Sequence, residues 1–268
     1  MRIEIRYSMT APVSHIGETA STGAYFNMIQ TSAGRLPVIT GNSIRGQIRD
    51  AGAGELLDRI GETVDKEVFH VLFSGGNVSA SMRDDVGRAA AVRERFPLIS
   101  VLGGALGTMI MAGKLLCGFA YPVCMEAAQM LGIQSRVSWH SLIDEIEFTR
   151  TDDAKNDRMA AGTEFVQRLT LLPGTTEIEV GALLSAIEYW WRTAPRLGGM
   201  SAKGFGSFDA RAEVGSVGSI CVADGNVQIS DAVQRLIDLY RQGTMDCAKD
   251  FDLLKGASKN GKKANSTD

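Results

Sequence analysis

Cysteine, histidine and proline are scarce in this chain of 268 residues, which contains four, three and six of them respectively. The cysteines form no CxxC pair and lie far apart, which fits neither a zinc site nor a disulfide framework. The N-terminal stretch, MRIEIRYSMT, also lacks the apolar core of a secretory signal. We therefore expect reduced thiols and a cytoplasmic protein.

An excess of positive charge is absent as well, because 28 Lys and Arg stand against 31 Asp and Glu, a net charge of −3. This balance excludes a globally basic nucleic-acid-binding protein, so any nucleic-acid site must be a local patch. The uncharged stretch at residues 96–113 is interrupted by Pro97 and by glycines. Such runs are typical of buried strands and turns, so we expect no membrane span.

The composition is otherwise that of a globular protein, with 44% hydrophobic residues and 30 glycines. Residues 2–7 alternate apolar and polar side chains, which predicts a strand with one buried face. Further strands are predicted at residues 115–123, 165–172 and 207–214, and helices at residues 41–60 and 176–193. The order strand, helix, strand, strand, helix, strand predicts an α+β fold of the ferredoxin-like type.

Several segments do not belong to this series of strands and helices. Residues 10–37 show no clear period, and we expect a hairpin around residues 25–29. A charged, helical insertion is predicted at residues 62–95. After residue 214 we expect a separate C-terminal part, residues 215–268, with a helix at 231–242 and a disordered, basic tail.

The first segment that could carry chemistry is PVITGNSIRGQIR, residues 37–49. Its two glycines permit close backbone approach, and the unpaired N–H groups of a helix start favour an anion such as phosphate. Arg45 and Arg49 are four residues apart and share a helix face. By spacing alone, a capped surface helix with two solvated arginines explains the same pattern.

The second segment, RLGGMSAKGFGSF at residues 196–208, combines four glycines with Ser201 and Lys203. Its backbone amides could wrap a phosphate chain, although neither the P-loop nor the dinucleotide-binding order is present. A plain tight turn is an equally valid interpretation.

The third segment is a polar loop within residues 147–163 that carries both basic and acidic side chains, and Met159 lies near its end. The aspartates do not follow the order of a calcium-binding loop. The alternative interpretation is a solvated loop of mixed charge.

Recognisable catalytic sets are absent from the sequence. His15, His70 and His140 are far apart and belong to no known metal or nucleophile motif, so a structural role is favoured for each over that of a general base. We expect no metal and no cofactor.

Several motifs together resemble the repeat-associated (RAMP) superfamily of CRISPR-associated proteins. They are TAPVSHIGE at residues 10–18, LPVITGNSIRGQIRD at 36–50, LFSGG at 72–76, KLLCGFAYPV at 114–123 and LGGMSAKGFGSF at 197–208. Within the superfamily, the chain is most similar to the multi-copy backbone subunit, the group-seven Cas protein, in its type IV version.

The resemblance implies an RNA-recognition-motif-like, ferredoxin-like palm over residues 1–214, with inserted fingers at about 62–95 and a thumb at about 139–163. It also implies that copies stack along a guide RNA (crRNA), which pairs with a target nucleic acid, in a complex with other CRISPR effector subunits. Met159 would wedge into the guide. The residues that would contact RNA are His15, Asn42, Ser43, Arg45, Arg49, Arg150, Lys155, Arg158, Met159, Gly199, Ser201, Lys203 and Gly204.

The chain departs from the RNA-cutting members of the family in one respect. Those relatives cut target RNA with an aspartate in the loop after the first strand. Residues 10–40 of this chain contain no Asp, and Glu18 is their only acidic residue. We therefore expect a scaffold that binds RNA without cutting it. Two alternatives stay open, namely a metal-independent endoribonuclease that uses His15 or His70 as base, and an interaction protein that binds no nucleic acid.

Overall fold

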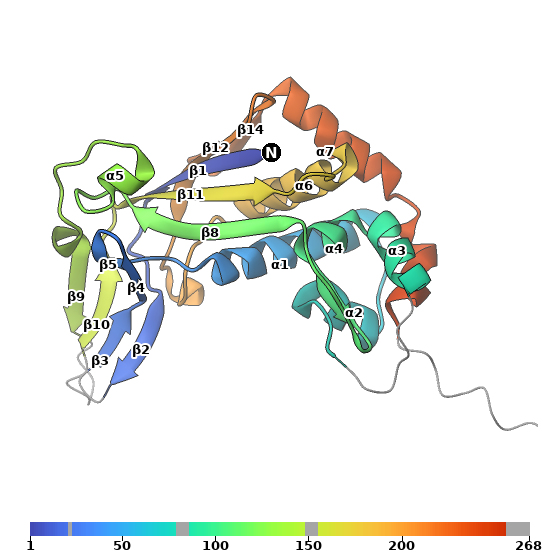
Figure 1. Ribbon diagram of the computed structural model, residues 1–268, viewed down its shortest axis with the longest axis horizontal. Coiled ribbons are helices and arrows are strands. Elements are labelled where there is room, and N and C mark those ends of the chain that lie inside the picture. The colour runs from blue at the N-terminus through green and yellow to red at the C-terminus, as the bar shows by residue number, and fades with distance from the viewer. Residues whose placement is uncertain (21–22, 79–85, 148–154, 256–268) are drawn as a thin grey trace, which may run out of the picture.

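The computed structural model describes residues 1–20, 23–78, 86–147 and 155–255. It has a mixed α+β architecture around an antiparallel sheet (Figure 1). A helical insertion and a smaller sheet lie at opposite ends of this sheet (Figure 1).

Six strands form the central sheet, in the order β14-β13-β12-β1-β11-β8, with every neighbouring pair antiparallel. Their bounds are β1 Arg2–Met9, β8 Leu115–Pro122, β11 Glu164–Leu171, β12 Phe208–Val214, β13 Gly218–Ala223 and β14 Asn226–Ile229. In β1, Ile3, Ile5 and Tyr7 are fully buried while Arg2 and Arg6 are exposed, which is the predicted alternation. The four strands expected from the sequence are thus confirmed.

Two helices, α1 Gly41–Ile60 and α6 Glu177–Thr193, cover one face of the sheet, and α7 Asp231–Gly243 packs on α6. Local signals set their ends. The Thr40 side chain caps α1, Gly61 ends it in a left-handed conformation, and a capping box of Thr176 and Glu179 starts α6. All three helices confirm the sequence predictions, and Trp191 of α6 is fully buried against the sheet.

On the opposite face of the sheet, the three central strands β1, β11 and β12 carry many charged side chains. Glu4 lies between Arg6 and Arg168 and forms an ion pair with each. The end of this face near β8 is covered by α5 Ala128–Leu131 and by the hairpin of β4 Met28–Thr31 and β5 Gly34–Pro37, which bury Leu36.

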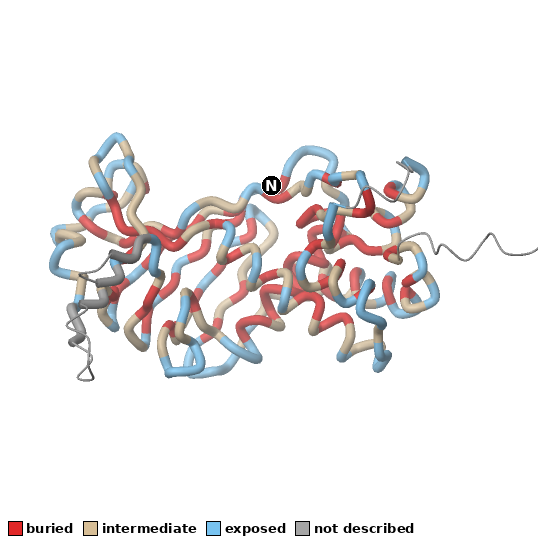
Figure 2. The backbone as a smooth tube through the Cα atoms, turned by 90° about the horizontal axis from the view of Figure 1, so that it is seen from below, coloured by how far each residue is buried: buried red, intermediate tan, exposed pale blue. Residues whose placement is uncertain are grey.

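The insertion between α1 and β8 packs around a second hydrophobic core, to which Ala53 and Leu56 of α1 also contribute. Its backbone contains many buried residues (Figure 2). It contains α2 Lys66–Ser74, α3 Val86–Arg95, α4 Pro97–Leu102 and the hairpin of β6 Gly104–Leu106 with β7 Met109–Met111. It therefore extends past residue 95, where the sequence prediction ended it, because the apolar residues 96–113 fold into α4 and this hairpin.

Among the described residues, no helix is both long and apolar enough to cross a membrane.

The sequence had suggested that the segment after residue 214 is a separate part of the chain. In the structure, this segment instead packs against what precedes it. Strands β13 and β14 extend the central sheet beside β12. A 3₁₀ helix at Cys247–Leu254 then enters the core of the insertion, where the ring of Phe251 stacks on Phe96 at 5.9 Å. Residues 256–268, the expected tail, lie outside the described residues.

Two segments that are far apart in the sequence form the smaller sheet at the other end, which we call the side sheet. Its order is β2-β3-β10-β9, with bounds β2 Ile16–Ala20, β3 Gly23–Phe26, β9 Ile143–Glu147 and β10 Lys155–Met159. The single hairpin expected around residues 25–29 is in fact two, since β3 pairs with β2 and β4 pairs with β5. A short 3₁₀ helix, Trp139–Leu142, precedes β9.

Candidate nucleic-acid interface

Residues 12–15 join the central sheet to the side sheet and contact three of the predicted functional segments. On one side, Val13 and Met159 of β10 exchange backbone hydrogen bonds of 2.9 and 3.0 Å. On the other side, the Gly199 N–H donates to the Ser14 carbonyl at 2.6 Å. The next residue, His15, accepts a hydrogen bond on Nε2 from the backbone N–H of Thr40 at 3.1 Å.

The start of α1 is therefore fixed against this segment by its cap residue. Asn42 is exposed and Ser43 half-buried in the first turn, which contains no acidic residue. Gly41 is required here, because a Cβ atom on it would lie 2.1 Å from the Cys117 carbonyl oxygen of β8. Since the first N–H groups of a helix have no partner within it, this turn can bind an anion.

The glycine loop, residues 196–206, supplies the second polar surface. Gly198 and Gly206 have positive φ angles of 75° and 79°, and Gly206 donates to the Pro12 carbonyl at 2.8 Å. These contacts leave the loop tip outside, where Ser201, Lys203 and Gly204 are exposed. The loop thus presents a hydroxyl, a cation and backbone amides to solvent.

Arg45 and Arg49 do not extend freely into solvent as a surface pair. Both guanidinium groups donate to the Leu102 carbonyl at the end of α4, and Arg49 also donates to Gly103 at 2.9 Å. Burial, and then the positive charge of Arg45, lower the pKa of Arg49 to about 10. The two side chains therefore connect α1 to the insertion, and Arg45 stays partly exposed.

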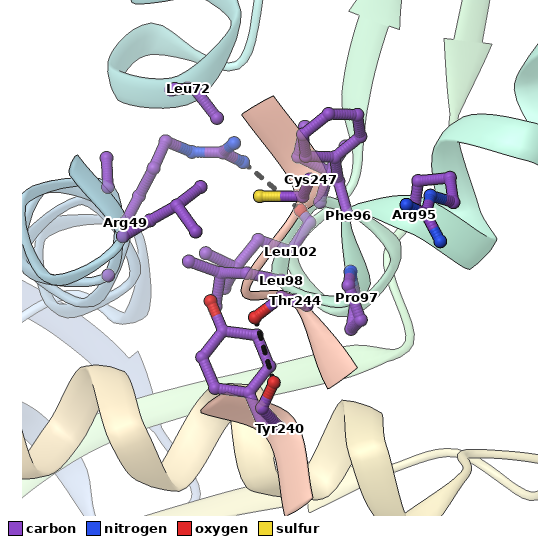
Figure 3. A pocket seen from close by; sticks show the side chains of 14 residues that line it. Arg49, Leu72, Arg95, Phe96, Pro97, Leu98, Leu102, Tyr240, Thr244 and Cys247 are labelled. Atoms are coloured by element: carbon purple, nitrogen blue, oxygen red, sulfur yellow. Dashed lines mark hydrogen bonds between the residues drawn. The ribbon is translucent and has the colours of Figure 1, made fainter. Parts of the chain in front are cut away.

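Arg49 also lines a cavity of about 20 Å³ between α1, α4 and α7 (Figure 3). The other walls include Leu72, Phe96 and Tyr240, all of them buried. The volume accommodates about one water molecule. This cavity is a packing gap where the two cores meet, and it is too small for an organic ligand.

The predicted thumb residues differ most from expectation. Arg158 is only 1% exposed, and its guanidinium lies 4.0 Å from the centre of the Phe205 ring beneath the glycine loop. Met159 is fully buried in the main core, so its side chain is not at a loop tip from which it could wedge into RNA. Both lie at the end of β10, where the strand returns to the body of the protein. Arg150 and the side chain of Lys155 lie outside the described residues.

The three histidines do not converge on one site. Burial lowers the pKa of His15, so the ring is neutral at pH 7 and its Nε2 is occupied by the Thr40 N–H. His70 belongs to α2 in the insertion, and His140 stacks on Trp139 at 3.6 Å beside the side sheet. Among the described side chains, no group of three or more His, Cys, Asp or Glu is placed to hold a metal ion.

The structure thus gathers His15, Asn42, Ser43, Gly199 and the loop bearing Lys203 around residues 12–15. It assigns packing roles to Arg49, Arg158 and Met159. Sequence reasoning missed Thr40 and Ser14, which hold the two polar surfaces in place. Thr40 had a usable signal, since Thr is a favoured cap residue directly before a helix start.

Comparison with known proteins gives one kind of match. No protein-family model matches the chain, and no curated protein does. Among solved structures, a chain of a "Type IV-B CRISPR Complex" superposes with a TM-score of 0.61 over 80% of this chain and 91% of that chain, at 18% identity. At this identity the likeness demonstrates a shared fold. The expected resemblance to type IV CRISPR proteins is confirmed at that level.

Proposed function

We propose that this protein is a guide-RNA-binding backbone subunit of a CRISPR effector ribonucleoprotein. The shared fold with a chain of a type IV-B CRISPR complex supports a role in such a complex. The strands that flank the two main helices lie in the order β12-β1-β11-β8. Numbered along the chain, this order is fourth-first-third-second, as in a ferredoxin-like fold, and it supports a palm built on these strands. The insertion would be the fingers of this palm, and residues 139–163 would be its thumb.

The observation that carries the proposal is that two consecutive residues, Ser14 and His15, hold the two polar surfaces in place. Ser14 holds the glycine loop through Gly199, and His15 holds the start of α1 through Thr40. Amides of the first helical turn and of the glycine loop, together with Lys203, would then bind successive phosphates of one RNA strand. Such contacts are independent of base sequence, as a protein that accepts any guide requires.

The remaining parts of the proposal concern assembly and chemistry. Further copies of the chain would bind along the guide, and the guide would pair with its target in the presence of other effector subunits. The chain itself would not cut RNA. His15, the nearest histidine to both surfaces, makes a hydrogen bond that orients α1 and leaves only Nδ1 available.

Co-expression with and without a CRISPR array tests the proposal. The expected result is a large particle in size-exclusion chromatography, with an absorbance ratio at 260 and 280 nm that indicates RNA of uniform length. Because phosphate contacts release counterions, this particle should dissociate at high salt. An RNA-free monomer in both preparations would contradict the proposal and favour a protein that acts through protein contacts alone.

Incubation with repeat RNA in the presence of EDTA tests the absence of cutting. We expect intact RNA after the incubation. A product ending in a cyclic phosphate would instead identify a metal-independent endoribonuclease, and its loss in His15→Ala would identify the base.

A further inference from the structure

A second cavity, of about 420 Å³, opens beside the side sheet and differs from the packing gap near Arg49. Its walls come from β3, β4, β5, β9 and β10 and from the 3₁₀ helix that precedes β9. The volume lies in the range of sites that hold a small organic group, about 300–1,000 Å³. None of the motifs in the sequence pointed to this place.

Three of the seven residues that line the cavity are aromatic. Tyr25 is 39% exposed, Phe26 is 2% exposed, and Trp139 is half-buried. Trp139 is also held in place, because its ring stacks on His140 and its backbone N–H donates to Glu126 at 3.1 Å. A flat, polarisable ligand would gain stacking contacts from these rings with little loss of side-chain freedom.

The polar groups of the cavity have both charges. Asp157 supplies carboxylate oxygens that can accept hydrogen bonds. Arg35 of β5 is exposed, and its guanidinium forms no hydrogen bond or ion pair with the part of the chain that the structure describes. An exposed Arg that lines a cavity with aromatic walls suits a ligand that joins a flat ring to an anionic group.

Two of the residues that line the cavity contact residues of the candidate nucleic-acid interface. The ring of Phe26 contacts the ring of His15 edge-on, with 6.1 Å between centroids. Ile143, which also lines the cavity, pairs across the strands with Met159, and the backbone of Met159 forms hydrogen bonds with Val13. The cavity therefore lies beside the segment, residues 12–15, that holds the two polar surfaces.

We propose that this cavity binds one unstacked nucleobase, in contact with Tyr25 and Trp139, while Arg35 binds a phosphate attached to that nucleotide. Stacking on aromatic rings and hydrogen bonds to base edges are the usual means by which proteins hold a base taken out of a helix. The inference rests on the proposed function only for the source of the base. That source is either the bound RNA strand or a free nucleotide, and the experiment separates the two.

Tryptophan fluorescence of the RNA-free, full-length protein provides the measurement. Trp139 is the most accessible of the three tryptophans, because Trp190 is 4% exposed and Trp191 is fully buried. Titration with uridine and adenosine 5′-monophosphates, and separately with a single-stranded RNA oligonucleotide, should quench this emission in a saturable way. Tyr25→Ala should weaken binding about tenfold, and Arg35→Ala about fivefold. Arg235→Ala serves as the matched control, since Arg235 is an exposed arginine on α7, away from the cavity.

The outcomes separate this inference from the proposed function. Quenching by RNA but not by mononucleotides supports a base of the bound strand, and quenching by mononucleotides alone supports a free nucleotide even if no RNA copurifies. Two results would overturn the inference: the absence of saturable quenching by every probe, or quenching that Tyr25→Ala and Arg35→Ala leave unchanged. If either result were found and RNA were still retained in the array experiment, the cavity assignment would be wrong while the proposed function would stand.

Discussion

The Nε2 atom of His15 accepts a hydrogen bond from the backbone N–H of Thr40, with 3.1 Å between the two nitrogens. This contact joins the segment beside the glycine loop to the cap of α1 across 25 residues of sequence. A neutral histidine thus holds the start of α1, one of the two surfaces proposed to bind phosphate, and protonation of Nε2 would remove the acceptor of this hydrogen bond.

The first prediction concerns the pH dependence of stability. Because burial lowers the pKa of His15 below the usual 6.5, the unfolded chain takes up a proton more readily than the folded one. The contribution of His15 to stability is therefore present above pH 6.5 and is lost as the pH falls below it. Thermal unfolding between pH 7.5 and 5 should show this loss, and His15→Gln, which keeps an acceptor, should flatten the profile. His140→Gln, at an exposed position, should not change it.

The second prediction compares two glycines of the same helix. Gly41→Ala should destabilise the protein by at least about 2 kcal/mol, because the new methyl group would collide with the Cys117 carbonyl. Gly46→Ala meets no atom within 4 Å and should stabilise α1 by about 0.5–1 kcal/mol. Urea unfolding measures both values. Equal effects of the two substitutions would mean that α1 does not approach β8 as described.

The third prediction separates a packing role of Arg158 from direct RNA binding. Arg158→Ala should lower the free energy of unfolding by about 3 kcal/mol, because it leaves a hole beneath Phe205. Arg158→Lys should recover little of this lost stability, since an ammonium group cannot stack on a ring as a planar guanidinium does. If instead guide affinity fell while urea unfolding was unchanged, Arg158 would be the RNA contact that the sequence suggested.

The fourth prediction concerns the salt dependence of guide binding. Lys203→Ala should weaken binding for all guide sequences alike and reduce the slope of log affinity against log salt by about one unit, because one phosphate contact is lost. Lys66→Ala is the control, since Lys66 is an exposed lysine at the start of α2 in the insertion. Titrations of labelled guide at several salt concentrations give both slopes. Identical slopes for the two variants would remove Lys203 from the interface.

Much of the fold was predictable from the sequence because local patterns encode it. The alternation along β1, the cap preferences at Thr176 and the proline after α6 act over a few residues. Their signals therefore survive in the sequence alone. The order of these elements was enough to predict a mixed α+β fold.

The candidate site was predictable only in part. Asn42, Ser43, Gly199 and Lys203 lie on exposed or half-buried positions of turns, where residue type and position agree. Arg49, Arg158 and Met159 had equally suggestive residue types, yet the structure places each against a distant segment. Whether an arginine contacts solvent, a ligand or a buried carbonyl depends on what folds over it.

The sequence by itself determined the individual strands and helices, because hydrophobic periodicity and capping are properties of short segments. Tertiary structure alone decided that β3 would pair with β10, that the 3₁₀ helix ending at Leu254 would enter the core of the insertion, and that an aromatic cavity would form around Trp139. These contacts join residues separated by more than one hundred positions. Their free energy comes from burial and hydrogen bonding between surfaces that no local pattern specifies.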